Sequence, residues 1–268
     1  MRLQVHHTTH YAYPEEPGFL VQRLLLTPAD FDGQTTEQWN ISAPGIETAL
    51  RHVDHAGNIS HLVTSRPPAS FSITASGIVE TRDTAGVVRG LPAQSPEALY
   101  LRVTPMTEAD AALRDFAAAF AGRAPALQRA HDLMAAVHKA LAYEVGTSHA
   151  GTTAVEAFKA GRGVCQDHAH VMIAAARRAG FPARYVTGYL VTGVGAGSAA
   201  AHAWAEVFIP DLGWVGFDAA NGQCPTDHYV RLAGGLDATA VPPIRGSRRG
   251  LPADEHLRVE VSVDIAQQ

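Results

Sequence analysis

The chain has 268 residues and a formal net charge of −5, and 46% hydrophobic with 18% charged residues is typical of a globular protein with a buried core. It has no block of basic residues, so it lacks the electrostatic footprint of a nucleic-acid-binding protein. Two cysteines, no signal-peptide core and no long apolar window predict a cytoplasmic protein without a disulfide framework or a membrane span.

The first hundred residues have the pattern of short β-strands. Strand-forming runs that end at Pro or Gly are LQVHHTTHYAY, VQRLLLTP, EQWNISAPG and FSITASGIVETRD. Two further runs flank residues 54–58, DHAGN, a five-residue turn that predicts a hairpin. We therefore predict an antiparallel, sandwich-like β-domain over residues 1–100.

The composition then changes to an Ala-rich segment with helical spacing. Residues 104–120 predict one helix, and residues 125–141 predict another. The apolar stripe of the second comprises Leu127, Ala130, Met134, Val137 and Leu141. Thr153 and Glu156 have the spacing of a capping box for a helix that stops at Gly161. The chain is thus predicted to be α+β, with a boundary near residues 95–106 and a second domain over residues 101–268.

The last third returns to strands. YVTGYLV precedes a Gly/Ala/Ser segment at Gly193–Ala200, and HAWAEVFI and WVGFD flank a turn at PDLG. The Gly/Ala/Ser segment is not a phosphate-binding loop, because no GK[ST] follows it. It is either a flexible connection or a mobile flap that leads into His202. VPPIRGSRRGLP follows as a Pro/Gly/Arg-rich segment, and LRVEVSVDI closes the chain as an alternating strand.

Cys165 lies at the start of a predicted helix. Ala169, Met172, Ile173 and further alanines recur at helical spacing after it, and a Gly/Pro stop signal follows Arg177 and Arg178. Free N–H groups and the helix dipole at such a start stabilise a thiolate. Gly161 and Gly163 permit a sharp turn in front of the cysteine.

A catalytic thiolate needs a base, and the base needs an orienting group. His202 begins the strand HAWAEVFI, and Asp218 ends the strand WVGFD. If the two strands pair across PDLG, both residues lie toward one end of the hairpin. The order after the nucleophile is then His and Asp.

These motifs resemble the core of the transglutaminase-like superfamily. GRGVCQDHAHVMIAAARRAGFPARYVTGYL and HAWAEVFIPDLGWVGFDAANG carry the resemblance in the core. HHTTHYAY, RLLLTP, DHAGN and the tail DHYVRLAGGLDATAVPPIRGSRRG are similar to bacterial transglutaminase-like cysteine proteinases, so that the resemblance covers nearly the whole chain. It implies a papain-like catalytic domain with Cys165 as nucleophile, His202 as general base and acid, and Asp218 as orienting carboxylate.

Candidate substrate-binding residues on the same basis are Tyr143, Gln166, His168 and Trp204. Position 168 departs from the pattern, because an aromatic residue is expected where this chain has His168. That places an ionisable ring one helical turn from the sulfur, and whether it tunes the site stays open.

Metal binding is the rival chemistry for the same residues. Cys165, His168 and His170 form C-x₂-H-x-H, and Cys224 with His228 forms C-x₃-H. On a helix, however, His168 and His170 point about 160° apart and cannot join Cys165 around one ion. We therefore predict no metal. Cys224 is interpreted as a semi-buried thiol, and His6, His7, His10, His52, His55 and His61 are interpreted as strand-face or turn residues.

The resulting prediction is a cofactor-free enzyme that transfers an acyl group from a peptide or protein amide through a thioester. Water as acceptor gives a peptidase or amidase, and an amine gives a transamidase. The bacterial resemblance favours hydrolysis. A catalytically idle peptide-binding or protein-binding module is the alternative of another class, and the sequence predicts no particular oligomeric state.

Overall fold

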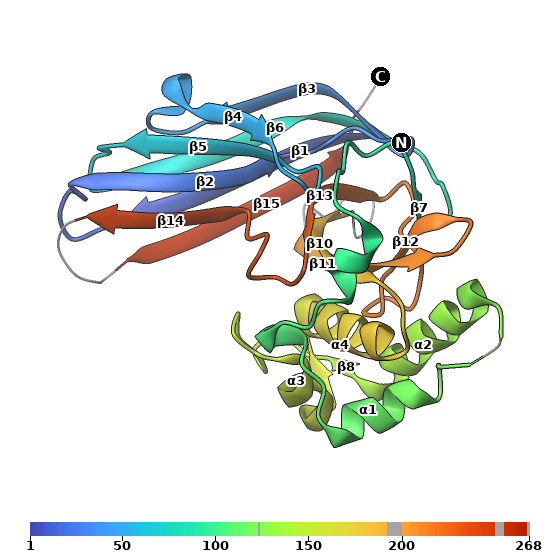
Figure 1. Cartoon of the computed structure of the whole chain (residues 1–268). Coiled ribbons are helices and arrows are strands. Elements are labelled where there is room, and N and C mark those ends of the chain that lie inside the picture. Colours follow the sequence, from blue (N-terminus) through green and yellow to red (C-terminus); the bar gives the residue numbers. More distant parts are fainter. Residues whose placement is uncertain (123, 192–199, 250–254, 267–268) are drawn as a thin grey trace.

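A β-sandwich, a central five-stranded sheet and a group of helices make up this computed structural model (Figure 1), which describes all residues except 123, 192–199, 250–254 and 267–268. The strands of the sandwich are β1 (Arg2–Ala12), β2 (Phe19–Thr27), β3 (Gln34–Ser42), β4 (Leu50–Val53), β5 (Ile59–Ser65), β6 (Ser70–Thr81), β14 (Ile244–Arg249) and β15 (His256–Ile265). The central sheet contains β7 (Val87–Val88), β10 (Ala183–Leu190), β11 (Ala200–Ile209), β12 (Gly213–Phe217) and β13 (Tyr229–Gly235). The helices are α1 (Ala111–Ala118), α2 (Ala126–Ala140), α3 (Ala154–Ala160) and α4 (Cys165–Arg178), and β8 (Ala142–Tyr143) pairs with β9 (Arg162–Gly163).

The predicted sandwich is confirmed. Its sheets have the strand orders β15-β1-β6-β3 and β14-β2-β5-β4, and every pair is antiparallel. Alternate residues of β1 and β6, such as Leu3, Val5 and Ile73, are buried between the sheets. The hairpin predicted around residues 54–58 joins β4 to β5, where Asp54 Oδ1 accepts hydrogen bonds from the backbone N–H groups of Ala56 and Asn58.

Strand pairing departs from the sequence-based division at residue 100. β14 and β15 return to the sandwich and pair with β2 and β1, whereas β7 pairs with β12 of the central sheet. β14 consists of IRGSRR, a segment whose Pro/Gly/Arg-rich composition did not predict a strand. β15 confirms the strand expected there, although its residues do not alternate in burial. The two parts are therefore threaded through each other, and the boundary near residues 95–106 stays a prediction.

The helical segment begins later than its composition indicates. Residues 105–107 form a short 3₁₀ turn, and α1 starts only at Ala111, where Asp110 caps it by accepting from the backbone N–H of Leu113. In α2 the predicted stripe is wrong at one position, because Leu127 is 38% exposed and Leu133 is buried in its place. None of the described helices is long and apolar enough to cross a membrane.

The central sheet lies between the sandwich and the helices, as Figure 1 shows. α4 packs on the face of β11 that carries Ala203, Ala205 and Val207, and these small side chains permit a close approach. The residues of β11 that alternate with these, His202, Trp204 and Glu206, point to the opposite face of the sheet because side chains alternate along a strand. Every residue of β10 is buried, since the strand is covered on both faces.

Candidate active site

Cys165 is the first residue of α4, as predicted, and is half-buried. α3 ends at Gly161, which has a left-handed conformation with φ of 65°. A Cβ on Gly163 would lie within 2.5–2.8 Å of the Asp167 side chain, so the approach to the helix requires glycine there. Asp167 is fully buried and its Oδ2 accepts hydrogen bonds from Val164 N, at 2.7 Å, and from Ser148 Oγ, at 2.5 Å. This carboxylate therefore fixes the turn that presents the thiol, beyond the favourable dipole interaction that its position predicts.

At the start of α4, the backbone N–H of Cys165 has no hydrogen-bond acceptor among the described residues. The N–H groups of Asp167 and His168 both donate to the carbonyl oxygen of Val164, at 3.0 and 3.1 Å. Among the described residues no acceptor takes the N–H of Cys165 itself. This is the usual situation for the first N–H of a helix, and it gives the site one free donor for a developing oxyanion.

His202 and Asp218 meet at one end of the hairpin formed by β11 and β12. The register pairs Ala205 with Phe217, so Asp218 lies across from Trp204 and two residues along from His202. The Nε2 of His202 is 2.7 Å from Oδ2 of Asp218. The expected proximity is confirmed, and the contact leaves the other ring nitrogen, Nδ1, for Cys165.

The two oxygens of Asp218 have different partners. Oδ1 accepts from the backbone N–H groups of Ala220 and Asn221, at 3.0 and 3.3 Å, and so caps the following turn. Oδ2 accepts from Asn221 Nδ2 and from the hydroxyl of Tyr229, both at 2.7 Å, in addition to facing His202. Asp218 is fully buried. Turn capping and imidazole orientation are therefore carried by one side chain.

The electrostatics of the site favour a charged histidine. Burial by itself lowers the pKa of His202, but hydrogen bonds and Coulombic attraction from Asp218 and Cys165 outweigh it and raise the pKa to about 9. Burial likewise opposes the ionised form of Asp218, yet its hydrogen bond and attraction to His202, with those from Asn221 and Tyr229, hold the pKa of Asp218 below its usual value. The pair is thus set up to hold an imidazolium beside a carboxylate.

Trp204 and Tyr229 form the wall behind His202. The Trp204 ring is stacked on His202 with centroids 6.2 Å apart, and Tyr229 meets Trp204 edge-on at 5.5 Å. Gly188 lies opposite His202 across the strands. A Cβ there would come within 2.7 Å of the Trp204 ring. Trp204 is therefore a buried wall residue, 3% exposed, directly next to the predicted base.

The other predicted substrate-binding residues are placed differently. Tyr143 is 56% exposed, lies 6.2 Å from the His168 ring, and burial together with the nearby Cys165 and Asp218 raises its pKa. Gln166 is half-buried, and its Nε2 donates to the carbonyl oxygen of Ala150 at 3.2 Å. Tyr143 is thus exposed close to Cys165 and Asp218, while Gln166 binds a neighbouring loop.

His168 is 1% exposed and turns away from solvent. Its Nδ1 lies 2.9 Å from the carbonyl oxygen of Val164, and its Nε2 lies 3.2 Å from that of Leu141. The two ring nitrogens thus lie beside backbone oxygens at the end of α2 and at the start of α4, and a ring with one N–H donates to one of them at a time. The ring therefore ties the two helices together at the thiol.

The residues considered for metal binding do not converge. His170 receives a hydrogen bond from the backbone N–H of Ala238, on a different side of α4 from His168. Cys224 is half-buried, and burial with the nearby Asp83 raises its pKa to about 11. No group of three or more potential ligand side chains comes together in the part of the chain that the structure describes. The histidines of the first hundred residues lie on β1, β4, β5 or the turn between the last two, as interpreted from the sequence.

Three contributors to the site were missed by sequence reasoning. Tyr229 comes from β13 and has no spacing signal that connects it to Asp218. Asn221 lies in the turn AANG that follows Asp218, and an Asn in such a turn is a plausible donor to a nearby carboxylate. Asp167 lies in the first turn of α4, where its position alone predicts only a favourable interaction with the helix dipole. The segment Gly193–Ala200 lies outside the described residues apart from the backbone of Ala200.

Comparison with known proteins gives the family. Residues 114–219 match the transglutaminase-like superfamily, and residues 3–80 match the bacterial transglutaminase-like N-terminal region. An uncharacterized protein of Mycobacterium tuberculosis is 30% identical over 294 residues, which cover 98% of this chain and 92% of that protein. The chain belongs to the transglutaminase-like superfamily.

Two further matches extend over nearly the whole chain. An uncharacterized protein of Mycobacterium leprae is 26% identical, with 99% of each chain covered. A crystal structure from Cytophaga hutchinsonii, described as that of "a putative cysteine protease", superimposes with a TM-score of 0.72 at 20% identity and covers 97% of this chain and 90% of that one. The similarity of fold thus extends over the sandwich as well as the core. Cys165, His202 and Asp218 all lie inside the region that matches the superfamily.

Proposed function

We propose that this transglutaminase-like protein is a cysteine-dependent hydrolase of peptide or protein amides. The observation that carries the proposal is the convergence of a thiol at a helix start with a buried imidazole and carboxylate pair. His202 has a pKa raised to about 9, so at neutral pH its ring can hold the proton taken from the Cys165 thiol.

The proposed reaction begins when the thiolate of Cys165 attacks the amide carbonyl carbon. The resulting oxyanion accepts a hydrogen bond from the free N–H of Cys165. Imidazolium His202 then gives its proton to the amide nitrogen, and the C–N bond breaks to leave a thioester. A water molecule gives a proton to His202 and attacks the thioester, which releases the carboxylic acid and restores the thiol.

Asp218 is proposed to orient His202 throughout this cycle. Its Oδ2 fixes Nε2, so Nδ1 stays directed to the sulfur, and its negative charge stabilises the imidazolium. The exposed Tyr143 offers an apolar surface for the acyl group near the thiol, and Trp204 supports His202 from behind. No step requires a metal or an organic cofactor.

Two alternative functions remain. A transamidase would form the same thioester but transfer the acyl group to an amine, and a binding module would form no thioester. An amine in place of water gives a transamidase, and the first half-reaction is identical. An idle binding module would not need the arrangement of Cys165, His202 and Asp218. Neither alternative has a structural observation of its own in its favour.

Alkylation by iodoacetamide at neutral pH, followed by mass spectrometry, tests the proposal. We expect modification at Cys165 to be much faster than at Cys224, whose thiol pKa is raised to about 11, and to slow in His202→Gln. Cys224→Ser is the matched control and should leave the rate at Cys165 unchanged. Equal and slow alkylation of both cysteines would favour an idle module. Screening peptides with and without added amine then separates hydrolysis from transamidation, and Cys165→Ala should abolish both without unfolding the chain.

A further inference from the structure

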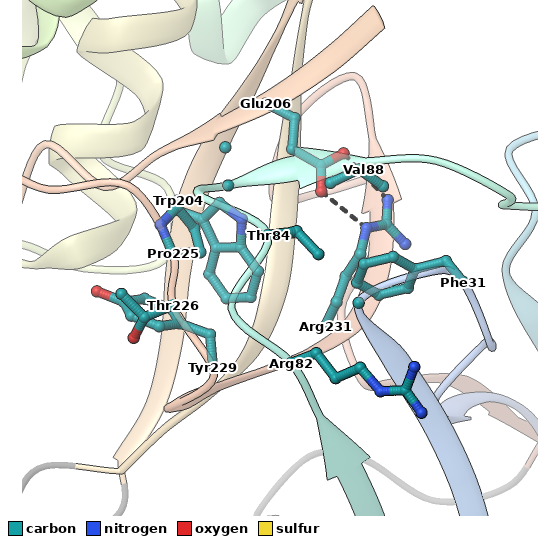
Figure 2. Close-up of a pocket in the computed structure, with 13 residues that line it drawn as sticks. Phe31, Arg82, Thr84, Val88, Trp204, Glu206, Pro225, Thr226, Tyr229 and Arg231 are labelled. Atoms are coloured by element: carbon teal, nitrogen blue, oxygen red, sulfur yellow. Dashed lines mark hydrogen bonds and ion pairs between the residues drawn. The ribbon is translucent and has the colours of Figure 1, made fainter. Parts of the chain in front are cut away.

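A small cavity lies on the face of the central sheet that carries His202. Trp204 and Tyr229 contact His202 on one side and line this cavity on the other, so they separate it from the candidate active site. Figure 2 shows Phe31, Arg82 and Thr84 lining it across from Trp204 and Tyr229. It leaves about 30 Å³ in which the centre of a water molecule can move. A single water needs roughly 10–15 Å³ by this measure, so the space suits two waters or one small ion.

The floor of the cavity has an excess of buried positive charge. Glu206 is fully buried between Arg184 and Arg231, which are 1% and 3% exposed. Burial by itself raises the pKa of Glu206, but the two guanidinium groups outweigh it and lower the pKa to about 2. Because both arginines stay charged, the three side chains carry a net charge of +1.

The two arginines compensate for this charge differently. Arg184 donates to Glu206 at 2.5 Å, and its guanidinium lies 4.1 Å from the Trp214 ring centroid, which supplies a cation–π contact. Arg231 donates to Glu206 from Nε at 2.8 Å and from Nη2 at 3.4 Å. Within the described residues no aromatic ring lies under the Arg231 guanidinium. Arg184 Nη2 is also buried without a hydrogen-bond partner, but of the two arginines only Arg231 lines the cavity. The positive charge that a bound group could meet in the cavity is therefore that of Arg231.

The polar hydrogens at the cavity lack acceptors. Across the described chain, no hydrogen bond forms from Nη1 of Arg231 or from the indole N–H of Trp204, although both residues are only 3% exposed and line the cavity. The Tyr229 hydroxyl is already used, because it donates to Asp218. Unpaired donors beside a buried positive charge favour an acceptor that also carries negative charge. Water would satisfy the donors but not the charge.

We propose that this cavity binds one small monovalent anion, of halide or formate size, against Nη1 of Arg231. The anion would complete the alternation of charge along Arg184, Glu206 and Arg231. It would also contact Trp204 and Tyr229, which form the wall behind His202, and hold them against Phe31 and Thr84. The interior space of about 30 Å³ favours such a small anion over larger carboxylates.

The first test is thermal unfolding at constant ionic strength, with chloride, bromide or formate replacing gluconate, which is too large for the cavity. We expect the melting temperature to rise along a saturation curve, by about 3 °C at ten times the dissociation constant. Arg231→Gln should abolish the rise. Arg231→Gln leaves Glu206 with one partner and could unfold. Val88→Leu is therefore the second variant, because it fills the cavity from β7 and leaves the charged residues intact.

Arg82→Gln is the matched control. Arg82 lines the cavity with its stem, but its side chain is 67% exposed and its guanidinium faces Glu80 at 3.5 Å. It should therefore retain the saturable rise. A crystal grown in bromide should show one anomalous peak beside Arg231 Nη1 in wild type and none in Val88→Leu. Two waters in place of the peak, or an anion dependence that Val88→Leu and gluconate share with wild type, would overturn the proposal. Neither readout depends on catalysis, so failure here is separate from failure of the proposed function.

Discussion

His202 and Asp218 are sixteen residues apart in the chain, and their side chains meet at 2.7 Å because one hairpin brings the start of β11 to the end of β12. The opposite oxygen of the same carboxylate caps the turn that follows. Orientation of the imidazole is therefore linked to the stability of that turn. A substitution at Asp218 must be read through both activity and folding.

Replacement of Asp218 tests this double role. Asp218→Asn keeps the shape but cannot both accept from His202 and accept from the turn, so we expect acylation to slow by roughly tenfold or more. For Asp218→Ala we expect about a hundredfold, since the imidazolium loses all support. Both variants should also lose about 1–2 kcal/mol of stability through the turn. Rates normalised by active-site titration, measured beside melting curves, separate the effects.

Asp211→Asn is the matched control, because Asp211 lies in the turn at the other end of the same hairpin and Asn tolerates its left-handed φ of 67°. It should leave both rate and stability nearly unchanged. Full normalised activity in Asp218→Ala would remove the carboxylate from the proposed mechanism.

Tyr229 is predicted to be a positioning residue that acts through Asp218. Tyr229→Phe removes a 2.7 Å hydrogen bond to Oδ2 that helps to hold the pKa of Asp218 low. We expect kcat/KM to fall about fivefold, with its acidic limb moved to higher pH, because Asp218 would protonate more easily. The measurement is the pH profile of kcat/KM.

Tyr189→Phe serves as the control for Tyr229→Phe. Its hydroxyl is also buried and bonded, at 2.8 Å to His7 Nδ1, but it faces the sandwich. A similar loss of stability is expected, without a shift of the acidic limb. If both variants move the limb equally, or neither does, Tyr229 has no special connection to Asp218.

How much of this site the sequence predicts depends on whether the signal is local. Cys165 at a helix start follows from periodicity and two glycines, and the approach of His202 to Asp218 follows from one short turn. Tyr229 could not be predicted, because β13 pairs with β10 and reaches Asp218 only through the tertiary fold. β14 was hidden for a related reason, since its Gly and Arg residues are stabilised as a strand by pairing with β2 and not by their own propensity.

The raised pKa of His202 predicts a pH-dependent loss of stability on the alkaline side. A group whose folded pKa, about 9, exceeds its ordinary value of 6.5 stabilises the fold fully below pH 6.5. This contribution disappears as the pH rises through 9, and it amounts to at most about 3 kcal/mol. Denaturant unfolding of wild type and His202→Gln between pH 6 and 10 measures it. The difference between the two proteins should shrink across this range, and a constant difference would contradict the ion-pair arrangement.

His168→Phe tests whether the unexpected histidine tunes the thiol or ties two helices together. Both ring nitrogens face backbone oxygens, of Val164 and Leu141, and neither is left for the sulfur. Phenylalanine keeps the buried volume but removes the ring donor. The carbonyl of Val164 keeps its two backbone donors, whereas that of Leu141 loses its ring partner. We therefore expect a loss of about 1–3 kcal/mol in the free energy of unfolding. The rate per folded molecule near neutral pH should stay nearly unchanged. The acidic limb of the rate profile is the decisive measurement, because a tie between α2 and α4 predicts that it stays in place. A moved limb at unchanged stability would instead assign His168 to the tuning of Cys165.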